Sequence, residues 1–201
     1  MSSEQPIVRQ HILDTARPII LTKGFSAVGL NEILSAADVP KGSFYHYFRS
    51  KELFGEALLD AYFADYRERL DALLGADGTT AADRLMRYWT LWLETQSSED
   101  AAGKCLAVKL GGEVSDLSEA MRVALERGTG RIVERLAACI REGVEDASLA
   151  AELEPHGTAL ALYDMWLGAT LLTKIRRDRA PLEAALAATH KLLKPAFPAA
   201  A

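Results

Sequence analysis

Residues 24–51 read GFSAVGLNEILSAADVPKGSFYHYFRSK, and the pattern of this segment predicts the fold of the amino-terminal part of the chain. Apolar residues at helical spacing predict a short helix over about 30–37, and a second short, aromatic helix is predicted over about 42–48. The tight connection between them contains Asp38, where a left-handed backbone is expected because Asp tolerates that conformation better than most residues. Two helices joined in this way form a helix-turn-helix, whose second helix can enter the major groove of double-stranded DNA.

The predicted helix over 42–48 has an inner and an outer side. Phe44 and Phe48 are four residues apart, so both are expected to face inward. The alternative is that the tyrosines beside them belong to the same aromatic core. We favour contact with phosphates and base edges for the polar-tipped residues, because cations flank them and a helix amino terminus attracts phosphate. The predicted DNA contacts on and beside this helix are Lys41, Gly42, Ser43, Tyr45, His46, Tyr47 and Lys51.

Charge is distributed unevenly along the chain. The net charge of −5, taken alone, argues against binding to nucleic acid. Residues 1–51 nevertheless hold six Lys and Arg against four Asp and Glu, which gives this segment +2 and leaves −7 for the rest. A basic segment on an acidic remainder indicates that the segment is the part that meets an anionic partner.

Helical periodicity continues through the rest of the chain, whereas alternating β-branched runs and hairpin dipeptides are missing from the sequence. The predicted fold class is therefore all-α, with a three-helix head over 1–51 and a helical body over 52–201. Pro18 is expected to kink the first helix, because proline removes a backbone hydrogen bond. Ser50 is the expected N-cap of the helix over 50–74. About nine helices are predicted, over 7–23, 30–37, 42–48, 50–74, 80–97, 102–110, 115–143, 155–178 and 181–193.

The motif G-x-F-Y-x-Y-F-x-x-K over residues 42–51, within a continuous match over about 7–54, resembles the DNA-binding domain of the TetR family of transcriptional regulators. The resemblance implies a homodimeric repressor that binds a pseudo-palindromic DNA operator and is released by a small-molecule effector. It also implies phosphate contacts for Tyr45, Tyr47 and Lys51, and a base-edge contact for Lys41.

The sequence departs from the family pattern in two places. A Thr usually caps the helix over 30–37 and touches phosphate, but Val28 and Gly29 occupy that place here. Asp38 replaces a glycine of the turn. One hydroxyl contact is lost, yet Gly29 still exposes backbone N–H groups, so it is kept among the predicted DNA contacts.

By the same resemblance, the body senses the ligand and dimerises through its last two helices. The sequence fits this, because apolar residues recur at helical spacing and small side chains allow close helix contact. The alternative is that these residues pack within one chain. They are Leu160, Tyr163, Leu167, Leu171 and Lys174, followed by Ala184, Ala185, Ala187 and Ala188.

An effector pocket is predicted where large aromatic residues gather in the body. Aromatic residues three positions apart on a helix also fit an ordinary hydrophobic core, which is the alternative. The predicted lining residues are Trp89, Trp92, Tyr163 and Trp166, with Met86, Tyr88 and Met165 beside them.

Cys105 is the predicted sensor residue. It stands at the expected first turn of a helix, with Lys109 four residues later, and such surroundings lower the pKa of a thiol and give a reactive thiolate. Residues 103–114 resemble the TetR branch that senses electrophiles or oxidants through a cysteine at this place. We expect Lys174 to lie near Cys105 and stabilise its thiolate. The alternative is a small buried hydrophobe, which is what we expect of Cys139.

Signals of other protein classes are missing from the sequence. The four His residues lack metal-site spacing, and dinucleotide, P-loop and nucleophile-elbow motifs are absent, so no enzyme, metal or cofactor is expected. The sequence shows no signal peptide and no apolar run long enough to cross a membrane. Two cysteines are too few for a disulfide-stapled secreted scaffold, so a cytoplasmic protein is expected. No membrane partner is expected.

Three functions stay open. The leading one is a repressor released by a reactive electrophile or oxidant at Cys105. The second is the same repressor class with a reversibly bound aromatic or hydrophobic effector and Cys105 as a bystander. A remote third is an all-α thiol enzyme or redox carrier.

Overall fold

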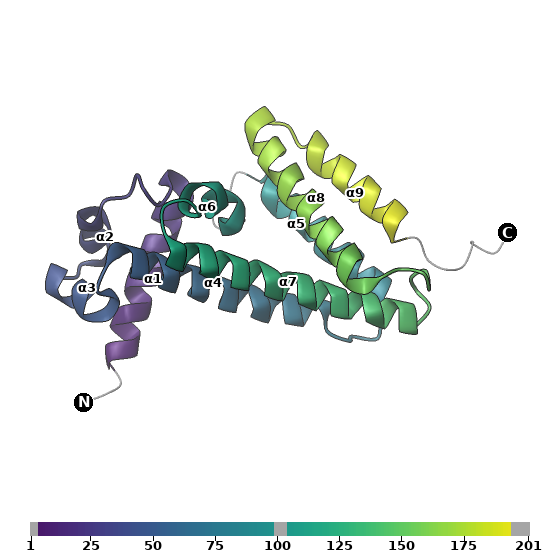
Figure 1. Cartoon of the computed structure of the whole chain (residues 1–201), viewed down its shortest axis with the longest axis horizontal. Helices are drawn as coiled ribbons and strands as arrows, with labels where there is room; N and C mark the ends of the chain where they lie inside the picture. The colour runs from purple at the N-terminus through teal and green to yellow at the C-terminus, as the bar shows by residue number, and fades with distance from the viewer. Residues whose placement is uncertain (1–3, 99–103, 194–201) are drawn as a thin grey trace. The chain divides into compact units, whose positions relative to one another are not determined.

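The computed structural model describes residues 4–98 and 104–193, and in these ranges it contains nine α-helices and no strand (Figure 1). The prediction of an all-α fold is therefore confirmed. The helices are α1 Glu4–Lys23, α2 Leu30–Ala37, α3 Lys41–Phe48, α4 Lys51–Leu74, α5 Ala81–Ser97, α6 Leu106–Val114, α7 Glu119–Glu145, α8 Pro155–Arg176 and α9 Ala180–Leu192.

The chain divides into two compact units that differ from a simple head and body. The first unit comprises Met1–Asp65 and Asp100–Thr129, and so contains α1 to α3, the first part of α4, α6 and the start of α7. The second comprises Tyr66–Glu99 and Gly130–Ala201, with the end of α4, α5, most of α7, α8 and α9. The boundary predicted between residues 51 and 52 remains a prediction about function.

The first unit is built around aromatic residues of α3 and α4. Phe44 and Phe48 are buried, as predicted, and their ring centroids lie 5.3 and 5.1 Å from that of Phe54. Ile12 and Ile20 of α1 are buried as well. This packing fixes α3 against α1 and α4, and leaves the opposite side of α3 exposed.

Local signals in the helix-turn-helix form as the sequence predicts. Asp38 has φ 51° and ψ 46°, which is the expected left-handed conformation, and its N–H points to the carbonyls of Leu34 and Ser35. Ser50 caps the start of α4, because its Oγ accepts a hydrogen bond from Leu53 N at 3.1 Å. α1 runs without interruption across Pro18.

The bounds predicted for the helix that follows Cys105 are wrong. The helix was expected to end at 110, but α6 continues to Val114 across Gly111 and Gly112. Leu110 and Val114 are both buried, and their packing outweighs the low helix propensity of the two glycines. Of the expected first residues, 102 and 103 lie outside the described ranges, while Lys104 and Cys105 precede α6, so the predicted start is wrong as well.

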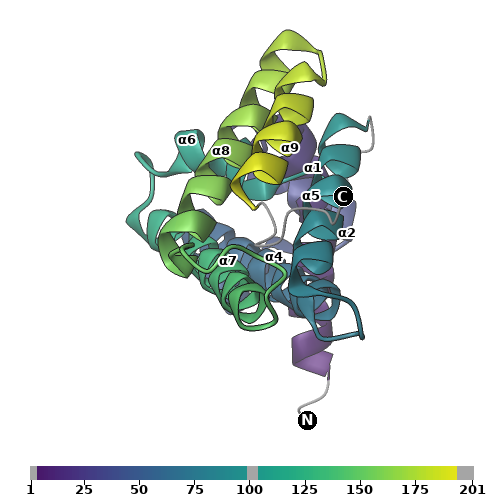
Figure 2. The same ribbon diagram turned by 90° about the vertical axis from the view of Figure 1, so that its right-hand side faces the viewer.

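The second unit packs α5 against α9, and α9 against α8. Figure 2 shows α8 and α9 running side by side. Between these helices lie the three tryptophans of the chain, all of them buried. The indole N–H of Trp92 donates to Thr170 Oγ1 and that of Trp166 donates to Thr189 Oγ1, both at 2.9 Å.

Candidate DNA-binding surface and sensor site

The exposed side of α3 carries the predicted DNA contacts. Lys41, Gly42 and His46 are exposed, and Tyr45 is 44% exposed. Ser43 and Tyr47 are half-buried. The alternative in which the tyrosines are sealed in the aromatic core is therefore wrong for Tyr45, whose ring rests edge-on against Phe44 with 5.6 Å between centroids.

The amino terminus of α3 leaves its first N–H groups without a side-chain cap. Pro40 occupies the N-cap position with extended φ −70° and ψ 150°, and no side chain caps the helix there. The Lys41 ammonium lies 5.9 Å from the centroid of the Tyr45 ring. A cation, a phenol and backbone N–H groups without a side-chain cap thus meet at one helix end, which suits a phosphate group.

Gly29 and Lys51 are the two predicted DNA contacts that lie outside α3. Gly29 is the exposed N-cap residue of α2, without a side-chain cap and with open space where a side chain would stand. The Lys51 ammonium donates to the carbonyl of Phe25 at 2.9 Å and lies 4.7 Å from the centroid of the Phe25 ring. Lys51 therefore stabilises the loop between α1 and α2, and its contact with phosphate remains a prediction.

Two further exposed cations lie at the carboxyl-terminal end of α3, and the sequence alone did not assign them a contact. Arg9 of α1 is exposed, and its guanidinium lies 5.3 Å from the centroid of the Phe48 ring. Arg49 is the exposed C-cap residue of α3, with φ 58°. Arg17 and Lys23, in contrast, pair with Asp65 and Glu32. Counting charges along the sequence treats all these cations alike. It does not show which of them form ion pairs within the protein.

Cys105 lies at the N-cap of α6, where its thiol is enclosed in the first unit. The residue is 7% exposed, and its Sγ lies 3.9 Å from the hydroxyl of Tyr62, which also accepts a hydrogen bond from Leu106 N at 3.3 Å. Burial raises the pKa of the Cys105 thiol above its usual value, although the N–H groups of Val108 and Ala107 and the Tyr62 hydroxyl act to lower it. The predicted lowering of this pKa is therefore wrong.

The contact made by Lys109, the cation four residues after Cys105, explains part of that error. The Lys109 ammonium donates to the carbonyl of Thr22 at 3.1 Å, in the last turn of α1. Lys174 lies on α8 and is exposed. The contact expected between Lys174 and the Cys105 thiolate remains a prediction.

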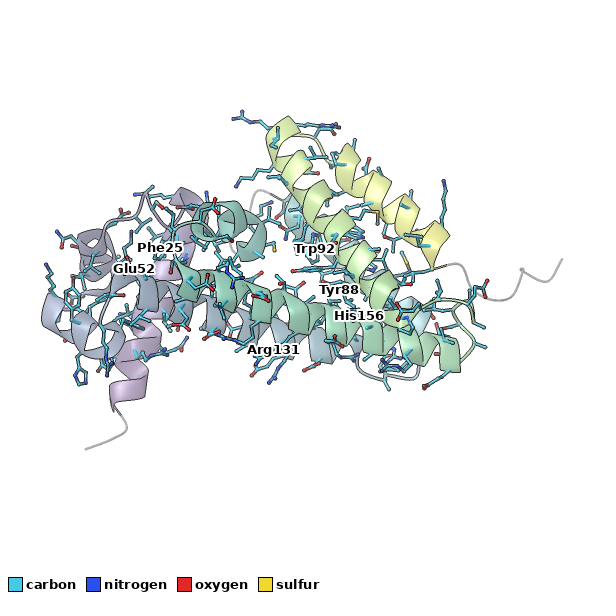
Figure 3. All side chains as sticks on the ribbon, viewed as in Figure 1. Phe25, Glu52, Tyr88, Trp92, Arg131 and His156 are labelled. Atoms are coloured by element: carbon cyan, nitrogen blue, oxygen red, sulfur yellow. The ribbon has the colours of Figure 1, made fainter. Side chains whose placement is uncertain are left out.

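The predicted effector residues of the body come together in the second unit. Trp89 of α5 stacks on Trp166 of α8 with 4.9 Å between centroids and 14° between planes, and Trp92 meets Tyr163 edge-on at 6.0 Å. All four are buried. Trp89 Nε1 has no hydrogen-bond partner among the described residues. This buried N–H is therefore available to donate a hydrogen bond to an acceptor atom of a ligand. Figure 3 labels Trp92 and Tyr88 in this cluster.

Other kinds of site find no support in the described part of the chain. Among residues 4–98 and 104–193, no group of three His, Cys, Asp or Glu side chains is placed to hold a metal ion. Within those same ranges, no helix combines the length and the apolar character needed to cross a membrane.

Comparison with known proteins gives matches along most of the chain. Residues 12–58 match the family described as "Bacterial regulatory proteins, tetR family", and residues 81–189 match the family described as "Tetracyclin repressor-like, C-terminal domain". The repressor NemR of Escherichia coli (strain K12) is 42% identical over 92% of this chain and 93% of its own length. The repressor DhaR of Mycobacterium sp. (strain GP1) is 35% identical over 94% of this chain and 93% of its own.

Solved structures agree with these matches. A crystal structure of E. coli NemR, described as its reduced form, superposes with a TM-score of 0.88 at 44% identity, covering 96% of this chain and 99% of that one. A regulatory protein TetR from Rhodobacter sphaeroides superposes with a TM-score of 0.81 at 32% identity, covering 92% of this chain and 98% of that chain.

Proposed function

This chain belongs to the TetR family of transcriptional repressors, and we propose that a reactive electrophile or oxidant releases it from its operator by modifying Cys105. The observation that carries the proposal is the enclosed position of Cys105 at the N-cap of α6, within the same compact unit as the helix-turn-helix. We further propose that it acts in the cytoplasm and is not an enzyme.

The operator-binding part of the proposal rests on the exposed side of α3. The contacts we propose are those predicted from the sequence on and beside α3, with Gly29, and the cations Arg9 and Arg49 join them as phosphate contacts. Two copies of this surface in a homodimer would read two half-sites of a pseudo-palindromic operator, about 34–36 Å apart.

The dimer contact is proposed on α8 and α9. Leu160, Leu171 and Ile175 of α8 are exposed although they are large and apolar, and their spacing places them on one face of the helix. On α9, Ala184 and Ala187 are exposed while Ala185 is buried. Small and apolar side chains that face outward from two neighbouring helices suit a bundle formed with a second copy.

The sensing step is a covalent addition to sulfur. For an α,β-unsaturated carbonyl compound, the Cys105 thiolate forms a bond to the β-carbon, and the electron pair of the C=C bond moves to the α-carbon. The proton lost by the thiol then returns to the α-carbon, so nothing leaves. Because Cys105 is buried beside the Tyr62 hydroxyl, we expect the added atoms to displace α6 or Tyr62.

The test is a fluorescence-anisotropy titration of duplex DNA from the region upstream of the protein's own gene, before and after treatment with N-ethylmaleimide. We expect operator affinity to fall about tenfold or more on modification, in the range of typical allosteric coupling. Cys139→Ala is the matched control and should respond like the wild type, since Cys139 is the other buried cysteine. Release that persists in Cys105→Ala would overturn the proposal.

A second candidate effector site is the aromatic cluster of the second unit. The unpartnered Nε1–H of Trp89 favours it, because a carbonyl or similar acceptor on an aromatic ligand would satisfy that buried donor. In this case Cys105 is a bystander, and a reversible ligand should release Cys105→Ala from the operator and quench tryptophan fluorescence. Trp89→Phe, which keeps a smaller aromatic ring and removes the indole N–H donor, should then weaken binding of that ligand.

A further inference from the structure

Glu113, in the last turn of α6, binds the loop that leads into the helix-turn-helix. Its Oε1 accepts a hydrogen bond from Ser26 N at 2.6 Å, and its Oε2 accepts one from Phe25 N at 3.2 Å. Both residues belong to the segment between α1 and α2, and all three residues lie in the first unit. We call this pair of hydrogen bonds the Glu113 contact.

The loop is shaped to receive the carboxylate. Gly24 has φ +94°, a conformation that side chains disfavour, and a Cβ built on it would lie 2.9 Å from Glu113 Oε2. Burial acts to raise the pKa of the Glu113 carboxyl, but hydrogen bonds from Ser26 and Phe25 and the charge of Lys109 bring that pKa below its usual value. Glu113 is thus a charged acceptor for two amides.

Neighbouring contacts join α6 and α4 to the same short stretch. One turn before Glu113 on α6, the Lys109 ammonium donates to Thr22 O at 3.1 Å. From the opposite side, the Lys51 ammonium of α4 donates to Phe25 O, and a Cβ built on Gly55 would lie 2.8 Å from the Phe25 ring. Phe25, labelled in Figure 3, is therefore bonded through its N–H to α6 and through its carbonyl to α4.

α6 connects the Cys105 thiol to the Glu113 contact and can carry a displacement from one to the other. Cys105 and Glu113 stand at opposite ends of α6, eight residues apart, which corresponds to about 12 Å along a helix. A helix of two and a half turns moves nearly as a rigid body. Because hydrogen bonds weaken steeply beyond about 3.5 Å, a shift of about 1 Å at Glu113 is enough to break the contact.

We propose that the Glu113 contact couples α6 to the helix-turn-helix, so that displacement of α6 withdraws the carboxylate from Phe25 and Ser26 and releases α2 and α3 from their operator-binding position. Glu113 is in this sense a positioning residue of the repressor. The inference rests on the proposed function, because it takes modification of Cys105 as the event that displaces α6.

The experiment measures two quantities on the full-length dimer in the Cys139→Ala background, so that N-ethylmaleimide reacts at Cys105 alone. The first is operator affinity by anisotropy, with and without the reagent. The second is hydrogen exchange of the Phe25 and Ser26 amides, followed by NMR. Variants are Glu113→Ala, Glu113→Gln, which keeps one acceptor oxygen, and the control Glu119→Ala, an exposed acid that pairs with Arg122 of its own helix.

The expected result is specific. Modification should lower operator affinity of the parent about tenfold or more and speed exchange at both amides. In Glu113→Ala the amides should exchange fast before any reagent is added, and modification should change operator affinity by less than about twofold. Glu113→Gln should show a loss of operator affinity on modification that lies between those of the parent and Glu113→Ala. This variant provides the test if Glu113→Ala does not fold. Glu119→Ala should behave like the parent in both measurements.

Two outcomes overturn the inference, and they can be told apart. If the parent is released on modification and both Glu113 variants are released by the same factor, the Glu113 contact does not transmit the signal, and Cys105 remains the sensor. If modification at Cys105, verified by intact mass, leaves operator affinity of the parent unchanged, the proposed function fails and the inference fails with it.

Discussion

At Gly29 the chain begins α2 without the side-chain cap that helices usually have. Its φ of −74° and ψ of 149° suit any residue, and nothing lies within 4 Å of a Cβ built there. We expect Gly29→Thr to raise the free energy of unfolding by about 0.5–1 kcal/mol, because it adds an N-cap and restricts the unfolded chain. Urea denaturation measures this. Gly29→Ala is the control for chain restriction alone, and equal stability of the two variants would contradict the capping argument.

The Cys105 thiol should react slowly at neutral pH. Burial raises its pKa, and only the thiolate reacts, so the fraction of reactive thiolate at pH 7 is below that of an ordinary cysteine. In the Cys139→Ala variant, the rate of alkylation by iodoacetamide should keep rising with pH beyond the value where a free thiol levels off.

The same variant unfolded in urea is the control for that measurement, and its thiol should titrate near the usual 8.5. A plateau for the folded protein at or below neutral pH would show that the thiol is ionised despite its burial. It would support the contact with Lys174 that the sequence predicts.

Sequence patterns predicted that Cys105 lies near the start of a helix, but they did not predict which side chains surround its thiol. Tyr62, whose hydroxyl lies beside the sulfur, is 43 residues away in the chain, and Lys109 turns toward Thr22. The sign of a pKa shift depends on burial, which comes from such distant partners. Local features such as the left-handed Asp38 and the cap at Ser50 were predictable, since each depends on a few neighbouring residues.

Among the elements, we expect α3 and the neighbouring α1 to carry the electrostatic part of operator binding. Lys41→Ala and Arg9→Ala should each lower the slope of log K against log salt by about 0.9, the value for one phosphate contact on duplex DNA. Anisotropy titrations over a range of KCl concentrations measure the slope. Lys23→Ala is the control, because Lys23 already pairs with Glu32 at 2.6 Å. An unchanged slope for Arg9→Ala would remove Arg9 from the DNA-binding surface.

Element bounds followed from the sequence wherever helix signals were local. The predicted ranges 30–37 and 155–178 correspond closely to α2 and α8. The end of α6 was missed because Gly111 and Gly112 resemble a stop, while burial of Leu110 and Val114 extends the helix. The hydrogen bonds from Phe25 and Ser26 to Glu113 were invisible to sequence reasoning, since they join residues nearly ninety positions apart.

At the scale of the whole molecule, α4 and α7 each contribute to both compact units. Periodicity predicts such long helices but not which half packs with which neighbours. Cys105 therefore falls in the unit of the helix-turn-helix, and the aromatic cluster falls in the other. The two candidate effector sites therefore lie in different compact units, and of the two only Cys105 shares a unit with the proposed DNA-binding surface.

The proposed function also requires a symmetric pair of chains, because one copy of α3 would read one half-site. Leu171 and Ile175 are 48% and 67% exposed on one face of α8, and removing them from water is expected to hold the dimer together. The double variant Leu171→Glu with Ile175→Glu should be monomeric at micromolar concentration in analytical ultracentrifugation. Its operator affinity should fall about 100-fold or more, since linked binding of two half-sites is lost.

Leu117→Glu serves as the matched control for that double variant. Leu117 is 65% exposed in the connection between α6 and α7, in the first unit, and lies outside the proposed dimer face. This variant should stay dimeric and keep its operator affinity. A double variant that remains dimeric and binds the operator as the wild type does would place the dimer contact elsewhere than on α8, because two buried carboxylates per chain are too costly for an interface to accommodate.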